Sequence, residues 1–387
     1  MKTRFACCLI AGAWLAAGAA PDTAEAPVGA LNVKVDARVE LISIIYRLAG
    51  NPEYSQGRVP AYLKELNRHF GLAQSHPAVL LARKLRQTRG VSYDAPMSLA
   101  VHLKDAQSLE LRTPLEPWPA GLDSRWRPDE LELFLEHARQ FARDTKFERF
   151  WQAHQSLYEQ TEARARQLVE SEGHLDWFDR FFGARPGARF HLAPALVNGG
   201  SCYGPKFQQG QQEELYCILG VWSCDAEGQP QFTREALPTI IHEFCHSYVN
   251  PVIYAHTAEL EPAGTNLFAQ VQSQMRRMAY GNWTTMMHES VVRAAVVRYL
   301  QATEGEAAAE RQIKQEIDRG FVWMRELAEL LARYETEREK HRDLAAFMPE
   351  IIRFFTRTAE KQKAERGGLL SIALRQDEFA QAPGIRN

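Results

Sequence analysis

Residues 239–251 read TIIHEFCHSYVNP, and this stretch decides how the rest of the chain is interpreted. Its apolar residues, with those next to it, recur at the spacing of a helix that buries one face: Leu237, Ile240, Ile241, Phe244, Tyr248 and Val249. Pro238 suits the first helical position, where its missing N–H group has no partner to lose. We expect Asn250-Pro251 to end the helix, because a residue before proline disfavours helical backbone.

Two histidines stand four residues apart on this predicted helix. His242 and His246 would project from one face, one turn apart, so that both imidazoles can reach a single metal ion. Glu243 is rotated by about 100° from His242 and can approach a water on that ion without being a ligand. The alternative is a pair of core histidines with ordinary hydrogen-bond partners. We favour the metal, since the motif lies on a convincing helix with apolar flanks.

A catalytic zinc site needs a third protein ligand and leaves its fourth position open. Glu289 is the preferred candidate, because it lies in WTTMMHESVVRAAVVRYL (residues 283–300), which is apolar around most of a helix and is therefore buried. A buried carboxylate needs a metal or a cationic partner. Arg293, one turn on, is an alternative ion-pair partner, or it could orient the carboxylate of a ligating Glu289. His256, beyond the predicted end of the motif helix, and His288, next to Glu289, are less favoured candidates for the third ligand.

A hydrolytic site of this kind also needs a donor for the developing oxyanion. Tyr280, just before the Glu289 segment, is the preferred candidate for this catalytic role, and Tyr254 is the second. The alternative for either residue is ordinary packing at the surface.

The overall composition is that of a soluble folded protein, with 45% hydrophobic and 24% charged residues and a net charge of −2. No basic stripe is present, so we expect no nucleic-acid partner. Residues 1–19 combine Lys2 and Arg4, an apolar run too short to span a bilayer and small residues at its end, which predicts a signal peptide. The mature protein is then periplasmic or secreted, without stable membrane insertion.

The chain divides into a predicted helical N-terminal region, a region that holds the motif, and a loosely ordered tail (residues 30–185, 186–365 and 366–387). Strands are expected at residues 188–196 and 215–222, so that the fold class is α+β, mainly helical, with a small antiparallel sheet. If residues 197–207 and 214–222 form a hairpin centred near Gln209-Gly210, Cys202 and Cys217 face each other. These two, with Cys224 and Cys245, could form disulfides or remain buried thiols.

Several of these segments carry a resemblance to known families. HEFCH with a helical glutamate some forty residues later resembles the gluzincin metallopeptidases. HEFCHSYVNP, NGGSCYGP, YGNW with HESVVRA, and VDARVELISIIYRLAG resemble an uncharacterised family of exported bacterial proteins that bears an HExxH signature, over about residues 33–355. The resemblance implies a zincin-like core in residues 186–365 and Zn²⁺ ligation by His242, His246 and Glu289.

Together these observations predict an exported peptidase that hydrolyses a peptide or protein substrate through a zinc-activated water, with Glu243 as general base. The alternative is a non-catalytic, metal-containing binding protein of the cell envelope.

Overall fold

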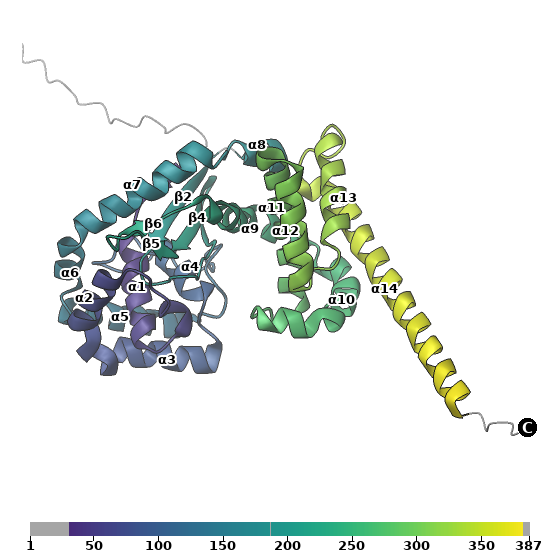
Figure 1. Ribbon diagram of the computed structural model, residues 1–387. Coiled ribbons are helices and arrows are strands. Elements are labelled where there is room, and N and C mark those ends of the chain that lie inside the picture. Colours follow the sequence, from purple (N-terminus) through teal and green to yellow (C-terminus); the bar gives the residue numbers. More distant parts are fainter. Residues whose placement is uncertain (1–30, 186, 382–387) are drawn as a thin grey trace, which may run out of the picture.

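The computed structural model describes residues 31–185 and 187–381, and only the backbone from residue 366 onward. Helices surround one small sheet, which confirms the mainly helical α+β class (Figure 1). The helices of the N-terminal region are α1 (Ala37–Leu48), α2 (Pro60–Phe70), α3 (Pro77–Arg89), α4 (Asp94–His102), α5 (Pro128–Asp144), α6 (Phe147–Ala153), α7 (Gln155–Glu172) and α8 (Trp177–Phe182). Those that follow the sheet are α9 (Leu237–Ala255), α10 (Thr257–Arg277), α11 (Trp283–Glu304), α12 (Glu306–Arg319), α13 (Met324–Thr336) and α14 (Leu344–Gln381).

The main sheet is mixed, so the expectation of an antiparallel sheet is wrong in this respect. Its four strands are β1 (Leu31–Val33), β2 (Ala188–Ala195), β3 (Lys206–Gln209) and β4 (Gln212–Gly220), in the order β1-β2-β4-β3. β1, β2 and β4 run parallel, and only β3 pairs antiparallel with β4. The sequence shows the local β3–β4 hairpin, whereas the three-residue β1 is too short to be recognised. β5 (Ser223–Cys224) and β6 (Pro230–Gln231) form a separate small sheet.

Both faces of the main sheet are covered, as is usual for parallel strands. Alternate residues of β4 enter different cores: Leu215, Cys217 and Leu219 pack toward the C-terminal helices, whereas Tyr216 and Ile218 pack toward the N-terminal helices. The sheet therefore separates two hydrophobic cores, one in each half of the molecule, and contributes side chains to both. In Figure 1 α1 to α6 lie on one side of the sheet, whereas α8 lies beside the C-terminal helices, to which α9 leads from the sheet.

The β3–β4 hairpin turns at Gly210-Gln211, since Gln209 pairs with Gln212. Gly210 has a φ of 61°, the left-handed backbone that such a tight turn requires. This register sets Tyr203 opposite Ile218 rather than Cys202 opposite Cys217. The predicted pairing of Cys202 with Cys217 is thus wrong by two positions in register. All four cysteines of the described residues are free thiols.

α9 does not end at Asn250-Pro251, contrary to expectation, but continues to Ala255. Pro251 cannot donate to the carbonyl of Ser247 four residues earlier. Arg185 instead donates to that carbonyl from Nη1, at 3.0 Å. A tertiary contact therefore replaces the missing backbone hydrogen bond, which lets the helix pass through the proline.

The structure describes the two ends of the chain to different extents. The predicted signal peptide lies outside the described residues. The predicted loose tail is in large part helical, because α14 continues past residue 366 to Gln381 through residues that favour helix, such as Leu369, Leu370 and Ala373. In Figure 1 this last part of α14 extends away from the other helices. None of the described helices is long and apolar enough to cross a membrane.

Candidate metal centre

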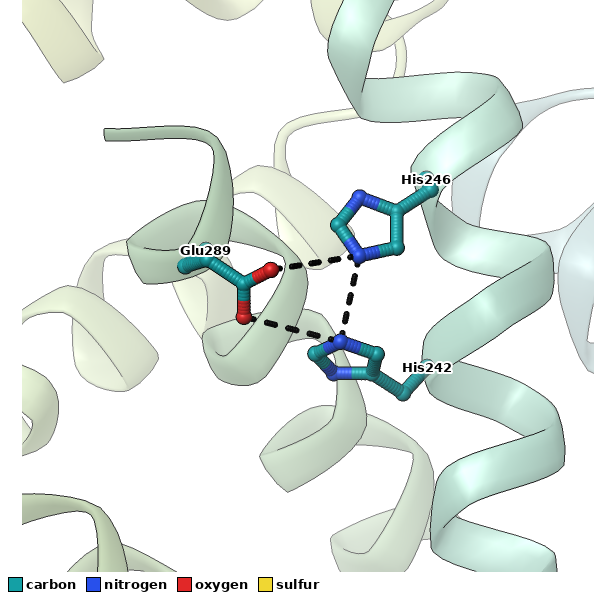
Figure 2. Close-up of side chains that lie close together, drawn as sticks. All are labelled: His242, His246 and Glu289. Atoms are coloured by element: carbon teal, nitrogen blue, oxygen red, sulfur yellow. Dashed lines mark hydrogen bonds and ion pairs between the residues drawn. The ribbon is translucent and has the colours of Figure 1, made fainter. Parts of the chain in front are cut away.

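His242, His246 and Glu289 meet at one point between α9 and α11 (Figure 2). The two Nε2 atoms lie 3.1 Å apart. Oε2 of Glu289 lies 3.5 Å from Nε2 of His242, and its Oε1 lies 3.4 Å from Nε2 of His246. The structure thus brings together all three residues that the sequence predicted as metal ligands.

The spacing of these atoms fits a small tetrahedral cation. Ligands about 2.0–2.1 Å from a zinc ion in tetrahedral geometry are about 3.3 Å from one another. The closest separations between the ligand groups, 3.1 to 3.5 Å, lie on either side of that value, and each histidine is nearest to a different oxygen of Glu289. Two imidazole nitrogens and one carboxylate are also a donor set that catalytic zinc sites use.

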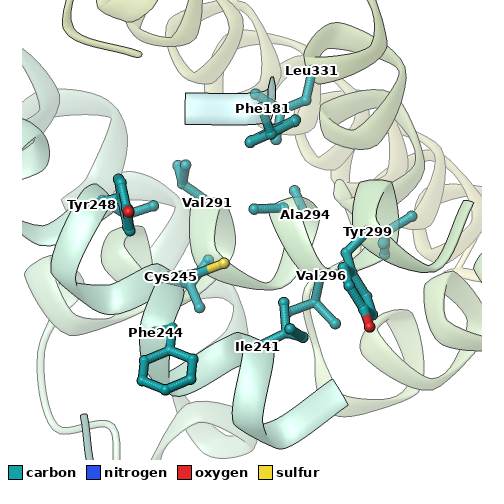
Figure 3. Packing of buried hydrophobic residues seen from close by; sticks show 14 of the residues in the cluster. Phe181, Ile241, Phe244, Cys245, Tyr248, Val291, Ala294, Val296, Tyr299 and Leu331 are labelled. Carbon is teal, nitrogen blue, oxygen red and sulfur yellow. The ribbon is translucent and has the colours of Figure 1, made fainter. Parts of the chain in front are cut away.

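Apolar packing holds the two helices in this register. The faces of α9 and α11 beside the metal ligands carry small and branched residues, including Cys245, Val291 and Ala294, that interlock in one core (Figure 3). Each of these side chains is fully buried. A rotation of either helix would open a void in this core, so the position of the ligands is fixed by packing that does not involve the metal.

Asn250 sets the orientation of His246. Its Oδ1 lies 3.1 Å from Nδ1 of the imidazole and accepts a hydrogen bond from that nitrogen. The proton on Nδ1 leaves Nε2 as the free lone pair, which points at the other two ligands. Burial lowers the pKa of His246, but the hydrogen bond and charge of Glu289 raise it to about 9, so metal binding would displace a proton from this ring.

A buried arginine controls Glu289. Burial by itself raises the pKa of this carboxyl, but the charge of Arg293 keeps it well below its ordinary value. Arg293 reaches Oε2 of Glu289 from Nε at 3.0 Å and from Nη2 at 2.9 Å. Its Nη2 also lies 2.8 Å from Oη of Tyr280. Glu289 is therefore ionised and held in place, as a metal ligand must be.

Glu243 lies one residue after His242 and lines the same cleft as that histidine. It is 8% exposed, and burial raises the pKa of its carboxyl to about 7. The main chain at Gly204 lies so close that a Cβ atom there would press on the carbonyl of Glu243 and come within 3.1 Å of its Oε2. A carboxyl with a pKa near 7 at the edge of a cleft can accept a proton from water and return it.

The cleft has a volume of about 1100 Å³ and lies between the two halves of the molecule. His242, Glu243 and Tyr280 line it from the C-terminal half, and Tyr93 and Tyr203 line it from the other half. Of the three predicted ligands, His242 lines this cleft, so the cluster meets a space large enough for a peptide segment at that histidine.

The other sequence candidates lie away from the cluster. His256 ends α9 and pairs with Glu259 at 3.3 Å. His288 points toward Tyr254, whose ring centre is 4.4 Å away, and Tyr254 is 63% exposed outside the cleft. Tyr280 does line the cleft, so of the two proposed oxyanion donors the structure places this one beside the site.

Sequence reasoning missed three residues of this site. Asn250 stands four residues after His246, a spacing that could have identified it as a partner of the imidazole. Gly204 and Glu316, which contacts Arg293, come from distant segments, and no local pattern marks either one.

Comparison with known proteins shows the family and nothing more specific. A domain of unknown function (DUF4932) matches residues 31–354, and the chain belongs to that family. Searches of curated proteins and of solved structures gave no match. The matched range includes both halves of the molecule and every residue of the candidate site.

Proposed function

We propose that this protein is an exported zinc-dependent peptidase, with His242, His246 and Glu289 as the metal ligands. The observation that carries the proposal is the spacing of the three ligand groups, 3.1 to 3.5 Å apart, beside a cleft that Glu243 also lines. The gluzincin resemblance supports the same site. The signal-peptide pattern of residues 1–19 supports export to the periplasm or the exterior.

The chain's own residues would divide the chemistry among them. Zinc in this site would make a water nucleophilic near neutral pH and polarise the carbonyl of the scissile bond. Glu243 accepts the proton of the attacking water and delivers it to the leaving amine. Tyr280, beside the site and hydrogen-bonded to Arg293, donates to the oxygen that becomes negative.

The second candidate is a metal-containing binding protein of the cell envelope without catalysis. A site that serves only structure is usually closed by four protein ligands. This cluster has three among the described residues and opens on a cleft with an acid beside it, which favours the enzyme.

The test is a comparison of the wild type with Glu243→Gln. We expect wild type purified without chelator to hold about one zinc ion per chain and to cleave members of a mixed peptide library. Glu243→Gln is expected to keep the zinc and to lose cleavage by a factor of roughly 10² to 10⁴, the usual contribution of a general base.

The matched control is Glu261→Gln, because Glu261 is exposed on α10 and does not line the cleft. This variant is expected to cleave like the wild type. Zinc binding without cleavage by the wild type would favour the binding protein, and absence of zinc would remove both candidates.

A further inference from the structure

Arg293 lies between two buried carboxylates from different helices. On α11 it holds Glu289, and its Nη1 lies 2.8 Å from Oε2 of Glu316 on α12. The side chain of Arg293 is 11% exposed and that of Glu316 is 1% exposed. The contact between Arg293 and Glu316 is therefore nearly free of solvent, where charges interact strongly.

Both carboxylate oxygens of Glu316 accept hydrogen bonds. Its Oε1 accepts from Nε2 of Gln312 and from Nη1 of Arg319, each at 2.6 Å. With Arg293 on its other oxygen, the carboxylate is fixed from three sides. A buried acid held this firmly costs desolvation energy, which suggests that it does more than fill space.

Arg293 contacts Glu289 through one of its two carboxylate oxygens. Both nitrogen contacts go to Oε2, and Oε1 is left facing Nε2 of His246. The arginine thus fixes the carboxylate through one oxygen, while Oε1 lies 3.4 Å from Nε2 of His246 and Oε2 lies 3.5 Å from Nε2 of His242. It also brings a positive charge next to the metal position, which would by itself repel a divalent cation.

Glu316 offsets that repulsion. Glu289, Arg293, Glu316 and Arg319 together carry no net charge, whereas without Glu316 the other three would carry one positive charge beside the metal position. We infer that Glu316 is a positioning residue for the metal centre: from α12, it holds Arg293 in contact with Oε2 of Glu289, and its charge prevents a net positive charge beside the metal position. This inference rests on the proposed metal site, not on peptidase activity.

The test measures zinc affinity directly, by competition with a chromophoric chelator on the full mature chain. Glu316→Gln is expected to bind zinc about 10-fold more weakly than wild type, within the range for residues that support metal ligands. The matched control is Glu310→Gln, which lies on the same helix in a surface ion pair with Arg325 and is expected to bind zinc as the wild type does.

A double-mutant cycle with Arg293→Met separates positioning from general stability. If Glu316 acts through Arg293, the effect of Glu316→Gln on zinc affinity largely disappears in the Arg293→Met background. Equal zinc affinity of wild type and Glu316→Gln, or additive effects in the cycle, would overturn the inference.

Arg293→Lys provides a second test of the inference if Glu316→Gln does not fold. The single lysine nitrogen keeps the charge but lacks the fork that contacts two carboxylates, so this variant should also bind zinc about 10-fold more weakly. Zinc affinity unchanged in Arg293→Lys contradicts the inference. If wild type binds zinc and the variants bind it weakly while none cleaves peptides, the inference holds and the peptidase proposal fails.

Discussion

At the scale of single residues, the helical period was enough to predict the three residues that the structure brings together as candidate metal ligands. His242 and His246 share a face of α9 by their spacing, and Glu289 stands out as an acid in an apolar helix. What the sequence could not show is contact between segments far apart in the chain. Glu316 resembles any other glutamate of a charged helix, because its role depends on where α12 packs.

Gly204 shows how closely Glu243 is enclosed. A methyl group at this position would press on the main-chain oxygen of Glu243, which belongs to α9 and cannot move without the helix. We expect Gly204→Ala to lower the free energy of unfolding by about 1–3 kcal/mol, the usual cost of overpacking. Chemical denaturation measures this change.

Gly281→Ala is the control, since nothing lies within 4 Å of a Cβ atom there. It should change the free energy of unfolding by less than about 0.5 kcal/mol. If Gly204→Ala is as stable as this control, the close approach to Glu243 is not a constraint.

At the scale of elements, α9 shows where a sound local rule fails. Proline predicts the end of a helix, and the prediction at Pro251 is wrong because Arg185, 66 residues earlier, satisfies the carbonyl that the proline leaves free. The short β1 was missed for a related reason, as its partner β2 lies far along the chain. The existence of α9 and of β2 was predicted from their own residues, whereas the end of α9 and the short β1 depend on distant partners and were not predicted.

The role of Arg185 can be tested by restoring the missing backbone donor. Arg185→Met is expected to lower the free energy of unfolding by about 1–3 kcal/mol, because it leaves the carbonyl of Ser247 without its donor and also breaks the pair with Glu213. Pro251→Ala supplies an N–H group to that carbonyl. It should therefore recover about 1 kcal/mol more in the Arg185→Met background than in the wild type.

Denaturant unfolding of the four proteins gives this coupling energy. Arg325→Met, which breaks an exposed pair with Glu310, is the control and should cost less than about 1 kcal/mol. Additive effects of Arg185→Met and Pro251→Ala would show that the arginine does not compensate for the proline.

At the scale of the whole molecule, Glu40 joins the N-terminal helices to the end of the sheet. Its Oε1 accepts from the backbone N–H of Leu196 at 2.8 Å, and its Oε2 accepts from the hydroxyl of Tyr62 at 2.6 Å. Burial raises the pKa of this carboxyl to about 7 from the ordinary 4.5. The folded protein therefore holds this proton more tightly than the unfolded chain does.

The sign of the resulting pH dependence follows from this raised pKa. The stabilisation is complete below about pH 4.5 and is lost as the pH rises to about 7. The free energy of unfolding of wild type, relative to Glu40→Gln, should fall by up to about 3 kcal/mol over that interval and change little above it.

Denaturant titrations of both proteins between pH 4.5 and pH 8 check this, with the exposed Glu261→Gln as a control that follows wild type throughout. A constant difference between wild type and Glu40→Gln across the range would contradict the raised pKa.

The parallel pairing of β1 with β2 also bears on how the protein is made. Leu31 finds its partner only at Phe190, and the sheet is complete only when β4 has ended at Gly220. The ribosome synthesises the N-terminal helices long before the sheet against which they pack is complete. Their apolar faces therefore stay unburied until β2 and β4 have been made. If the chain leaves the cytoplasm as its leader pattern suggests, this delay would help to keep it unfolded and fit for translocation until the crossing is over.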